Sequence, residues 1–184
     1  MIPDRKIRRS VEKNPTDTVR IMTTGRIELG PTGRTVAANV RRLRESRGLT
    51  LRALSAALKE RGRPLSADAI NKIENGDGNE TRGIRRVDVD DLMALAVALD
   101  VSPLALLLPH DARETTEITA AGQVAGREAW TWGRAFEPLG YRQITDEDER
   151  TRALMAFHLA SSPVGITQQS RQRLEAADDG PSVD

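Results

Sequence analysis

Residues 40–76 have the sequence VRRLRESRGLTLRALSAALKERGRPLSADAINKIENG. Aliphatic residues recur here every three or four positions, which is the period of one face of an α-helix. Gly48, Gly62 and Gly76 interrupt the pattern where helices are expected to end. The spacing predicts helices over about 35–47, 50–61 and 66–75. The stretch VDVDDLMALAVALDVSPLALL at 87–107 predicts two more, over about 88–99 and 102–108, closed by Pro109.

Four of these helices begin with the same local pattern. A Ser, Thr or Asp at the N-cap follows one aliphatic residue and precedes another by four positions, which together form a hydrophobic staple. The four caps are Thr50, Ser66, Asp88 and Ser102, the last with Pro103 at the first helical position. One such match is common by chance, but four within about 55 residues predict a compact helical domain.

The segments on either side are less regular. Residues 1–34 mix charges with Pro and Gly and show no sustained period, which predicts a disordered basic arm, and Met1 and Met22 are both compatible with a translation start. Residues 115–120 fit a short strand, 126–136 fit a helix, and 145–160 fit either a helix starting at Thr145 or a strand. We expect a main domain over 35–109, a partly ordered extension over 110–160 that is a candidate for dimerisation, and a disordered tail over 161–184.

Charge is distributed unevenly along the chain. The 184 residues have a net charge of +1, with +4 in residues 1–35, +2 in 36–108 and −5 in 109–184. A basic front and an acidic back predict an anionic partner for the front alone. No run of 18 apolar residues is present, so we expect no membrane span and a cytoplasmic protein.

The sequence offers little for catalysis or metal binding. There is no Cys, which excludes disulfides, thiolate metal sites and Cys nucleophiles, and His110 and His158 cannot form a multi-His site. The segment GPTGRT at 30–35 lacks the spacing and the Lys of a phosphate-binding loop. We therefore expect a protein that is not an enzyme and needs no cofactor.

Three motifs together carry a family resemblance. RGLT at 47–50, INKIENG at 70–76 and ALAVALDVSPLALLL at 94–108 resemble the DNA-binding domain of the lambda-repressor/Cro family, the Xre-type helix-turn-helix, over residues 36–108. The resemblance implies a mainly α fold, a five-helix bundle with a small C-terminal extension and disordered termini. It also implies double-stranded DNA as the partner, a homodimer, and a location with the nucleoid in the cytoplasm.

In this family the second helix of the motif enters the major groove, and here it is the helix at 66–75. Ile70 and Ile73 supply its buried face. Asn can pair bidentately with adenine, Lys can donate to guanine, Asp can accept from cytosine, and Ala can touch a thymine methyl. By similarity to the family, the base-reading residues are Ala67, Asp68, Asn71 and Lys72.

The chain departs from the family at the phosphate contacts. Leu51 stands where a polar phosphate ligand is usual, so we expect the adjacent Arg52 to bind the phosphate instead. The turn KERGRPLS and the loop after the third helix are both long and basic. Backbone cations of this kind give affinity and register rather than sequence readout. The expected phosphate ligands are Arg52, Arg61, Arg63, Arg82, Arg85 and Arg86. Arg44 and Glu74 match positions that commonly form a structural ion pair in the family.

These observations predict a sequence-specific transcriptional regulator, with repression by steric blocking as the default mode and activation as the open alternative. The alternative is a protein-interaction or antitoxin-like module that keeps the helix-turn-helix as a scaffold and uses its acidic C-terminal region to bind a protein partner or effector. Trp130 and Trp132 are two positions apart and cannot share a helical face. One is expected to pack on the bundle, and a dimer contact and a ligand cage stay open for the pair.

Overall fold

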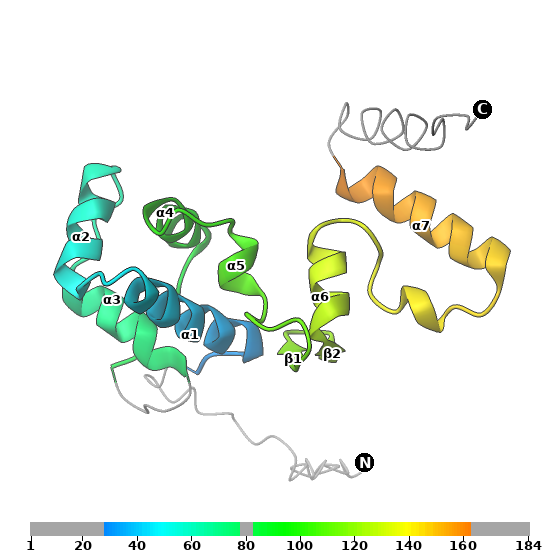
Figure 1. Cartoon of the computed structure of the whole chain (residues 1–184), viewed down its shortest axis with the longest axis horizontal. Helices are drawn as coiled ribbons and strands as arrows, with labels where there is room; N and C mark the ends of the chain where they lie inside the picture. The colour runs from blue at the N-terminus through cyan, green and yellow to red at the C-terminus, as the bar shows by residue number, and fades with distance from the viewer. Residues whose placement is uncertain (1–27, 78–82, 163–184) are drawn as a thin grey trace, which may run out of the picture.

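The computed structural model describes residues 28–77 and 83–162. Within these ranges the chain is mainly helical, as the sequence predicts, with one small antiparallel sheet (Figure 1). The elements are α1 (Pro31–Ser46), α2 (Leu51–Glu60), α3 (Ala67–Glu74), the 3-10 turn η1 (Asn75–Asp77), α4 (Val89–Ala98), α5 (Leu104–Leu107), β1 (Thr115–Ile118), β2 (Gly122–Ala125), α6 (Gly126–Gly133), the 3-10 turn η2 (Tyr141–Gln143) and α7 (Glu147–Ser161).

Three of the four predicted caps start helices. The Thr50 hydroxyl accepts from the Ala53 N–H at 3.1 Å, and the Ser66 hydroxyl accepts from the Ala69 N–H at 3.0 Å. The Asp88 carboxylate accepts from the N–H three residues on at 2.7 Å. Each bond satisfies a backbone donor that has no partner within its helix. Ser102 accepts from the Leu104 N–H at 3.3 Å, but α5 begins only at Leu104.

The first helix begins earlier than the sequence predicts. The irregular composition predicts disorder through residue 34, whereas α1 starts at Pro31, so the prediction is wrong for residues 31–34. Proline suits the first helical position because its φ is already helical and no N–H partner is needed there. Gly30 is the extended N-cap, and Arg34 Nη1 donates to the Leu29 carbonyl at 2.9 Å. The rest of the predicted arm, residues 1–27, lies outside the described residues.

The hydrophobic cluster at the centre of the bundle formed by α1 to α5 contains only aliphatic side chains. The five aromatic residues of the chain all lie between 130 and 157, so this bundle must bury branched and small side chains instead. Burying each one contributes about 1.5–3 kcal/mol for a Leu, Ile or Val. The buried set is Val36, Val40, Leu43, Leu54, Leu58, Leu65, Ile70, Ile73, Leu95, Ala96, Leu99 and Leu106.

A buried amide joins α1 to the end of α5. Asn39 is 4% exposed, and its Nδ2 donates to the carbonyls of Leu106 at 3.1 Å and Leu108 at 2.8 Å. Both acceptors lie at the C-terminal end of a four-residue helix, where carbonyls have no helical partner. Asn39 is not among the residues predicted to matter, although a polar residue between Val36 and Leu43 on the apolar face of a helix was a usable signal.

The C-terminal extension packs onto this end of the bundle through a second cluster. β1 and β2 pair antiparallel, from Thr115 opposite Ala125 to Ile118 opposite Gly122. Leu108, Val124 and Ala129 are buried there, and the Trp130 indole donates to the Pro109 carbonyl at 2.8 Å. A Cβ at Gly126 would lie 2.6 Å from the Glu114 carbonyl oxygen, so this close approach requires glycine.

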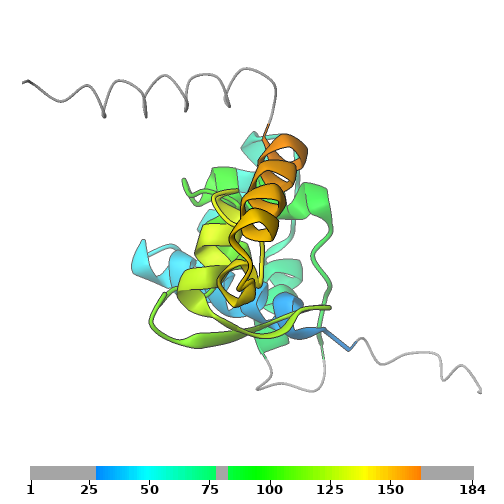
Figure 2. The same cartoon turned by 90° about the vertical axis from the view of Figure 1, so that its right-hand side faces the viewer.

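Residues 145–160, for which the sequence fits either a helix or a strand, lie mostly in the helix α7. Its cap is Asp146 rather than the expected Thr145, and the Asp146 carboxylate accepts from the Glu149 N–H at 2.7 Å. None of the residues of α7 is buried, and the helix lies apart from the bundle in Figure 1, whereas it lies in front of the other helices in the view of Figure 2. His158 Nε2 donates to the Phe136 carbonyl at 2.8 Å. α7 reaches Ser161, one residue into the predicted tail, and residues 163–184 lie outside the described residues.

Replacing Asn39 by Ala should lower the free energy of unfolding by about 2 kcal/mol, because two buried carbonyls lose their donor. Urea denaturation followed by circular dichroism measures this loss. Asn71→Ala removes the same side chain from an exposed position and should change stability by less than about 0.5 kcal/mol. Equal losses in the two variants would show that the Asn39 amide does not secure α5.

Candidate nucleic-acid interface

The third helix presents one buried and one exposed face. Ile70 and Ile73 are fully buried in the bundle core, which fixes the rotation of α3 about its axis. Asp68, Asn71 and Lys72 are exposed on the other side, and Ala67 is half-buried. The structure therefore brings the four predicted base-reading residues to the surface of α3.

Two of these residues contact each other. Lys72 Nζ lies 2.7 Å from the Asp68 carboxylate, one helical turn away, and both side chains are largely exposed. Such an exposed pair contributes only about 0.5 kcal/mol, so Lys72 can exchange this carboxylate for another acceptor at little cost. The sequence signal for this pair is the spacing of four residues between opposite charges on one helix, which the sequence predictions did not use.

The predicted ion pair between the first and third helices is present and buried. Arg44 Nε lies 2.7 Å from Glu74 Oε1, and Arg44 Nη2 lies 2.8 Å from Glu74 Oε2. Glu74 is 2% exposed, and its hydrogen bond with Arg44 raises the pKa of the guanidinium. Arg41 donates to the Glu74 carbonyl at 3.1 Å and to the Asp77 carboxylate at 2.7 Å. These contacts secure the C-terminal end of α3 to α1.

A second buried carboxylate holds the segments on both sides of α3. Asp91 is fully buried, and it accepts from Arg63 Nε at 2.8 Å and from Arg85 Nη2 at 2.6 Å. Arg63 lies in the turn before α3, and Arg85 lies in the loop after it, where its N–H donates to the Lys72 carbonyl at 2.9 Å. A desolvated carboxylate needs such partners because an unpaired buried charge is costly.

This network includes two of the predicted phosphate ligands, Arg63 and Arg85. The hydrogen bond to Asp91 raises the pKa of the Arg63 guanidinium, and Arg63 Nη2 also lies 2.9 Å from the Asp88 carboxylate. The backbone N–H of Asp91 lowers the pKa of Asp88, which keeps that cap ionised. Arg63 and Arg85 therefore each hold a buried carboxylate of the protein itself, and their phosphate contacts stay predictions. In the sequence, Asp91 stands three residues after a cap and resembles a weak capping-box residue, a pattern that gives no sign of its burial.

The other predicted phosphate ligands have three different surroundings. Arg52 is exposed in the first turn of α2, and within residues 28–77 and 83–162 it makes no hydrogen bond or ion pair. A cation at a helix N-terminus is opposed by the helix dipole, so the fold gains nothing from this placement. Arg61 caps its own helix through the Ala57 carbonyl at 2.9 Å, and Arg86 donates to the Glu28 carbonyl at 3.1 Å. Arg82 lies outside the described residues.

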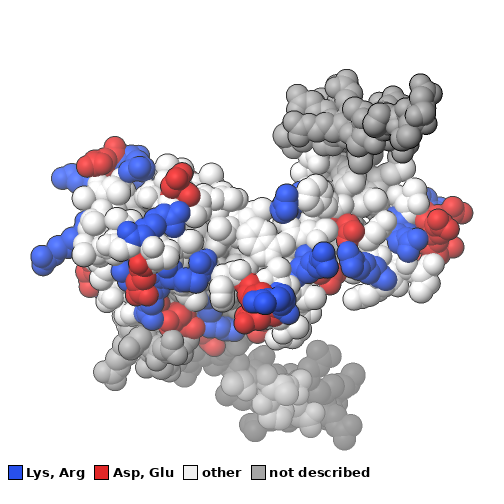
Figure 3. All heavy atoms as spheres, in the orientation of Figure 1, with Lys and Arg blue, Asp and Glu red and all other residues white. Residues whose placement is uncertain are grey.

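Charges of both signs are interspersed over the bundle in the face shown in Figure 3. No broad basic field covers this face. The arginines at 44, 63 and 85 hold carboxylates of the protein itself. This arrangement leaves few cations available to bind an anion, and it leaves the exposed polar face of α3 as the surface that could distinguish one ligand from another.

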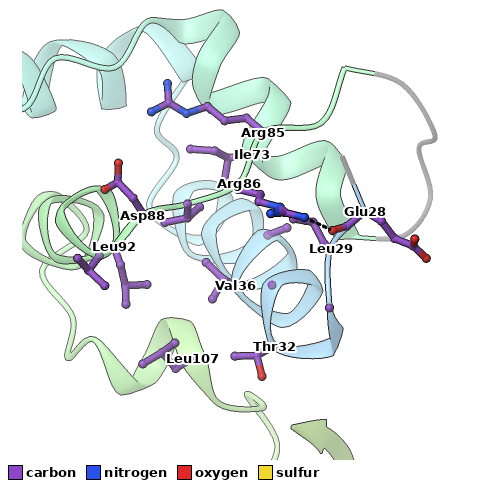
Figure 4. Close-up of a pocket in the computed structure, with 15 residues that line it drawn as sticks. Glu28, Leu29, Thr32, Val36, Ile73, Arg85, Arg86, Asp88, Leu92 and Leu107 are labelled. Atoms are coloured by element: carbon purple, nitrogen blue, oxygen red, sulfur yellow. Dashed lines mark hydrogen bonds between the residues drawn. The ribbon is translucent and has the colours of Figure 1, made fainter. Parts of the chain in front are cut away.

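An apolar groove that the sequence did not reveal lies beside the start of α4. It has a volume of about 360 Å³, and its walls include Val36, Leu92 and Leu107, with Arg86 and Glu28 at the rim (Figure 4). The dashed bond in Figure 4 joins the Arg86 side chain to the Glu28 carbonyl across this rim. Residues of α1, α3, α4 and α5 line the groove.

Comparisons with protein-family models, with curated proteins and with solved structures found no match. In the described part of the chain, no helix combines the length and the apolar character needed to cross a membrane.

Replacing Glu74 by Ala should lower the free energy of unfolding by about 3 kcal/mol, because the largely buried Arg44 would lose its buried carboxylate and keep only the exposed Glu45 as a charged partner. Asp68→Ala breaks an exposed pair on the same helix and should cost less than about 0.5 kcal/mol. Urea denaturation of both variants measures the difference. Similar losses would mean that the buried pair does not anchor α3.

Proposed function

We propose that the chain is a sequence-specific DNA-binding regulator of the lambda-repressor/Cro type, with α1 to α5 as the five-helix bundle and α3 in the major groove. The observation that carries this proposal is the two-sided character of α3. Its aliphatic residues are buried in the core and its C-terminal end is anchored by Glu74, while Asn71 and Lys72 project from a rigid support. Rigid presentation of a few polar groups is what direct base readout requires.

In this proposal each of the four predicted base-reading residues of α3 contacts a different base. Asn71 pairs with adenine, Lys72 leaves Asp68 to donate to guanine, Asp68 accepts from cytosine, and Ala67 contacts a thymine methyl. Arg52 binds a phosphate, and Arg61 and Arg86 stay as weaker candidates because each already donates to a backbone carbonyl. Arg63 and Arg85 are the weakest candidates, because each already holds the buried Asp91 carboxylate.

The regulator would act as a homodimer on two half-sites about one helical turn apart, within the nucleoid, and repress by blocking access to the promoter. Purified protein should retain a small set of fragments from sheared genomic DNA of the source organism, and sequencing should find a shared two-fold motif. Diffuse recovery that salt washes away would contradict sequence-specific binding, because only the phosphate contribution would then be present.

Asn71→Ala and Lys72→Ala should each weaken binding to the recovered operator by about 1–3 kcal/mol and bind random DNA almost normally. Arg52→Ala should weaken both to a similar extent and reduce the slope of log affinity against log salt by about 1. Fluorescence anisotropy at several salt concentrations separates the two patterns. A uniform loss in the α3 variants would show that these residues do not read bases.

The second candidate function, a protein-interaction module, is favoured by α7. This 15-residue helix buries none of its residues, and Phe136, Met155 and Leu159 are exposed around it. An isolated helix of this length is marginal in water, so a partner surface would stabilise it. Nuclease-treated lysate should then yield one stoichiometric protein that Leu159→Glu fails to retain, whereas Lys72→Ala retains it. Retention of the same protein by both variants would exclude α7 as the binding surface.

A further inference from the structure

The fourth helix is apolar even where it faces solvent. Val89 is 76% exposed, Met93 is 51% exposed and Val97 is 58% exposed, and their spacing of four places them in one row along α4. From Leu92 to Ala98 the helix contains no charged residue. A helix that is hydrophobic on all sides is normally buried on all sides. We call Val89, Met93 and Val97 the α4 stripe.

The stripe continues into the groove beside it. Val89 belongs to both, and Leu92 and Leu107 extend the apolar surface toward α5 (Figure 4). White atoms predominate around α5 in the space-filling view, between the charged side chains of the bundle and those of the extension (Figure 3). A continuous apolar patch rimmed by polar residues marks a surface that binds another molecule.

We propose that the α4 stripe binds the α4 stripe of a second copy of this chain, with the two helices antiparallel and a two-fold axis passing beside Met93. The row is symmetric about Met93, so the two-fold places Val89 of one copy against Val97 of the other. Rows of residues four apart form the ridges by which helices interlock. A two-fold interface requires a self-complementary surface of this kind.

Charge favours the same arrangement. Asp90 is the charged residue of α4 beside the stripe, and it lies at the N-terminal end of the helix. In an antiparallel pair the two Asp90 carboxylates lie at opposite ends, whereas a parallel pair would bring them together. At the C-terminal end of α4, Arg47 Nη2 donates to the Asp100 carbonyl at 3.2 Å. In the proposed pair this guanidinium supplies a cation at the end of α4 that the incoming Asp90 approaches.

The size of the surface sets the strength of the dimer. α4 has ten residues and a length of about 15 Å, so the pair covers less than the roughly 1,200 Å² of a standard specific interface. We therefore expect weak self-association in solution, which binding to two adjacent half-sites would strengthen by raising the effective concentration. This interface rests on the homodimer of the proposed function, but its test needs no DNA.

Single cysteines test the geometry because the chain has none of its own. Under mild oxidation, Met93→Cys should form a disulfide-linked homodimer. Val89→Cys and Val97→Cys should cross-link to each other when mixed, at least about tenfold faster than either does alone, because a disulfide requires Cβ atoms about 4 Å apart. Met155→Cys on α7 has matched exposure, 53% against 51% for Met93, and represents the rival surface. Faster cross-linking at Met155, or equal rates for the mixed and separate variants, would overturn the proposal.

Sedimentation equilibrium of the full chain gives an independent readout. Met93→Glu places two like charges face to face at the axis and should weaken self-association at least tenfold, as loss of a central interface residue typically does. A folded Met93→Glu variant with wild-type self-association, or a wild-type chain that stays monomeric up to its solubility limit, would overturn the proposed interface. Operator binding by such a monomer would leave sequence-specific DNA binding standing and would overturn the homodimer.

Discussion

Glu74 and Asp91 place two carboxylates inside the bundle, and the position of α3 depends on how these charges are neutralised. Each would be costly to bury alone. Arg44 reaches Glu74 from α1, while Arg63 and Arg85 reach Asp91 from the segments before and after α3. The two carboxylates therefore connect α3 to α1 and α4 through side-chain ion pairs. α3 has only eight residues, and a helix this short is not stable by itself. The ion pairs fix its orientation in the bundle.

This arrangement divides the basic residues between structure and binding. The arginines that pair with buried carboxylates have little freedom to move toward a phosphate, because doing so would leave a buried charge unpaired. Arg52 has no such commitment among the described residues, and the exposed pair of Lys72 with Asp68 separates cheaply. With a net charge of only +2 over residues 36–108, a DNA complex of this chain would depend on well-placed contacts more than on a strong electrostatic field.

The apolar side chains fall into two groups, those buried in the two hydrophobic clusters and those exposed on helices outside them. The aliphatic residues of α1 to α5 close one core, and Trp130 with the hairpin closes a second cluster against the end of α5. Outside these clusters, α4 and α7 keep large apolar side chains in solvent. Both helices thus have faces that the folded monomer does not satisfy. The α4 stripe is symmetric about Met93, and a two-fold contact needs a surface with this symmetry.

Local chemistry determined the helices, and tertiary structure decided the roles of the charges. Caps such as Thr50 and Ser66 act within a few residues, so the sequence alone located the starts of α2, α3 and α4. The start of α1 at Pro31 escaped the sequence because the apolar period begins only at Val36, after the first turn has formed. An arginine suits a phosphate and a carboxylate equally well, so sequence could not show that Arg63 and Arg85 bind Asp91. That outcome required the fold to bury Asp91 between them, since burial makes pairing obligatory.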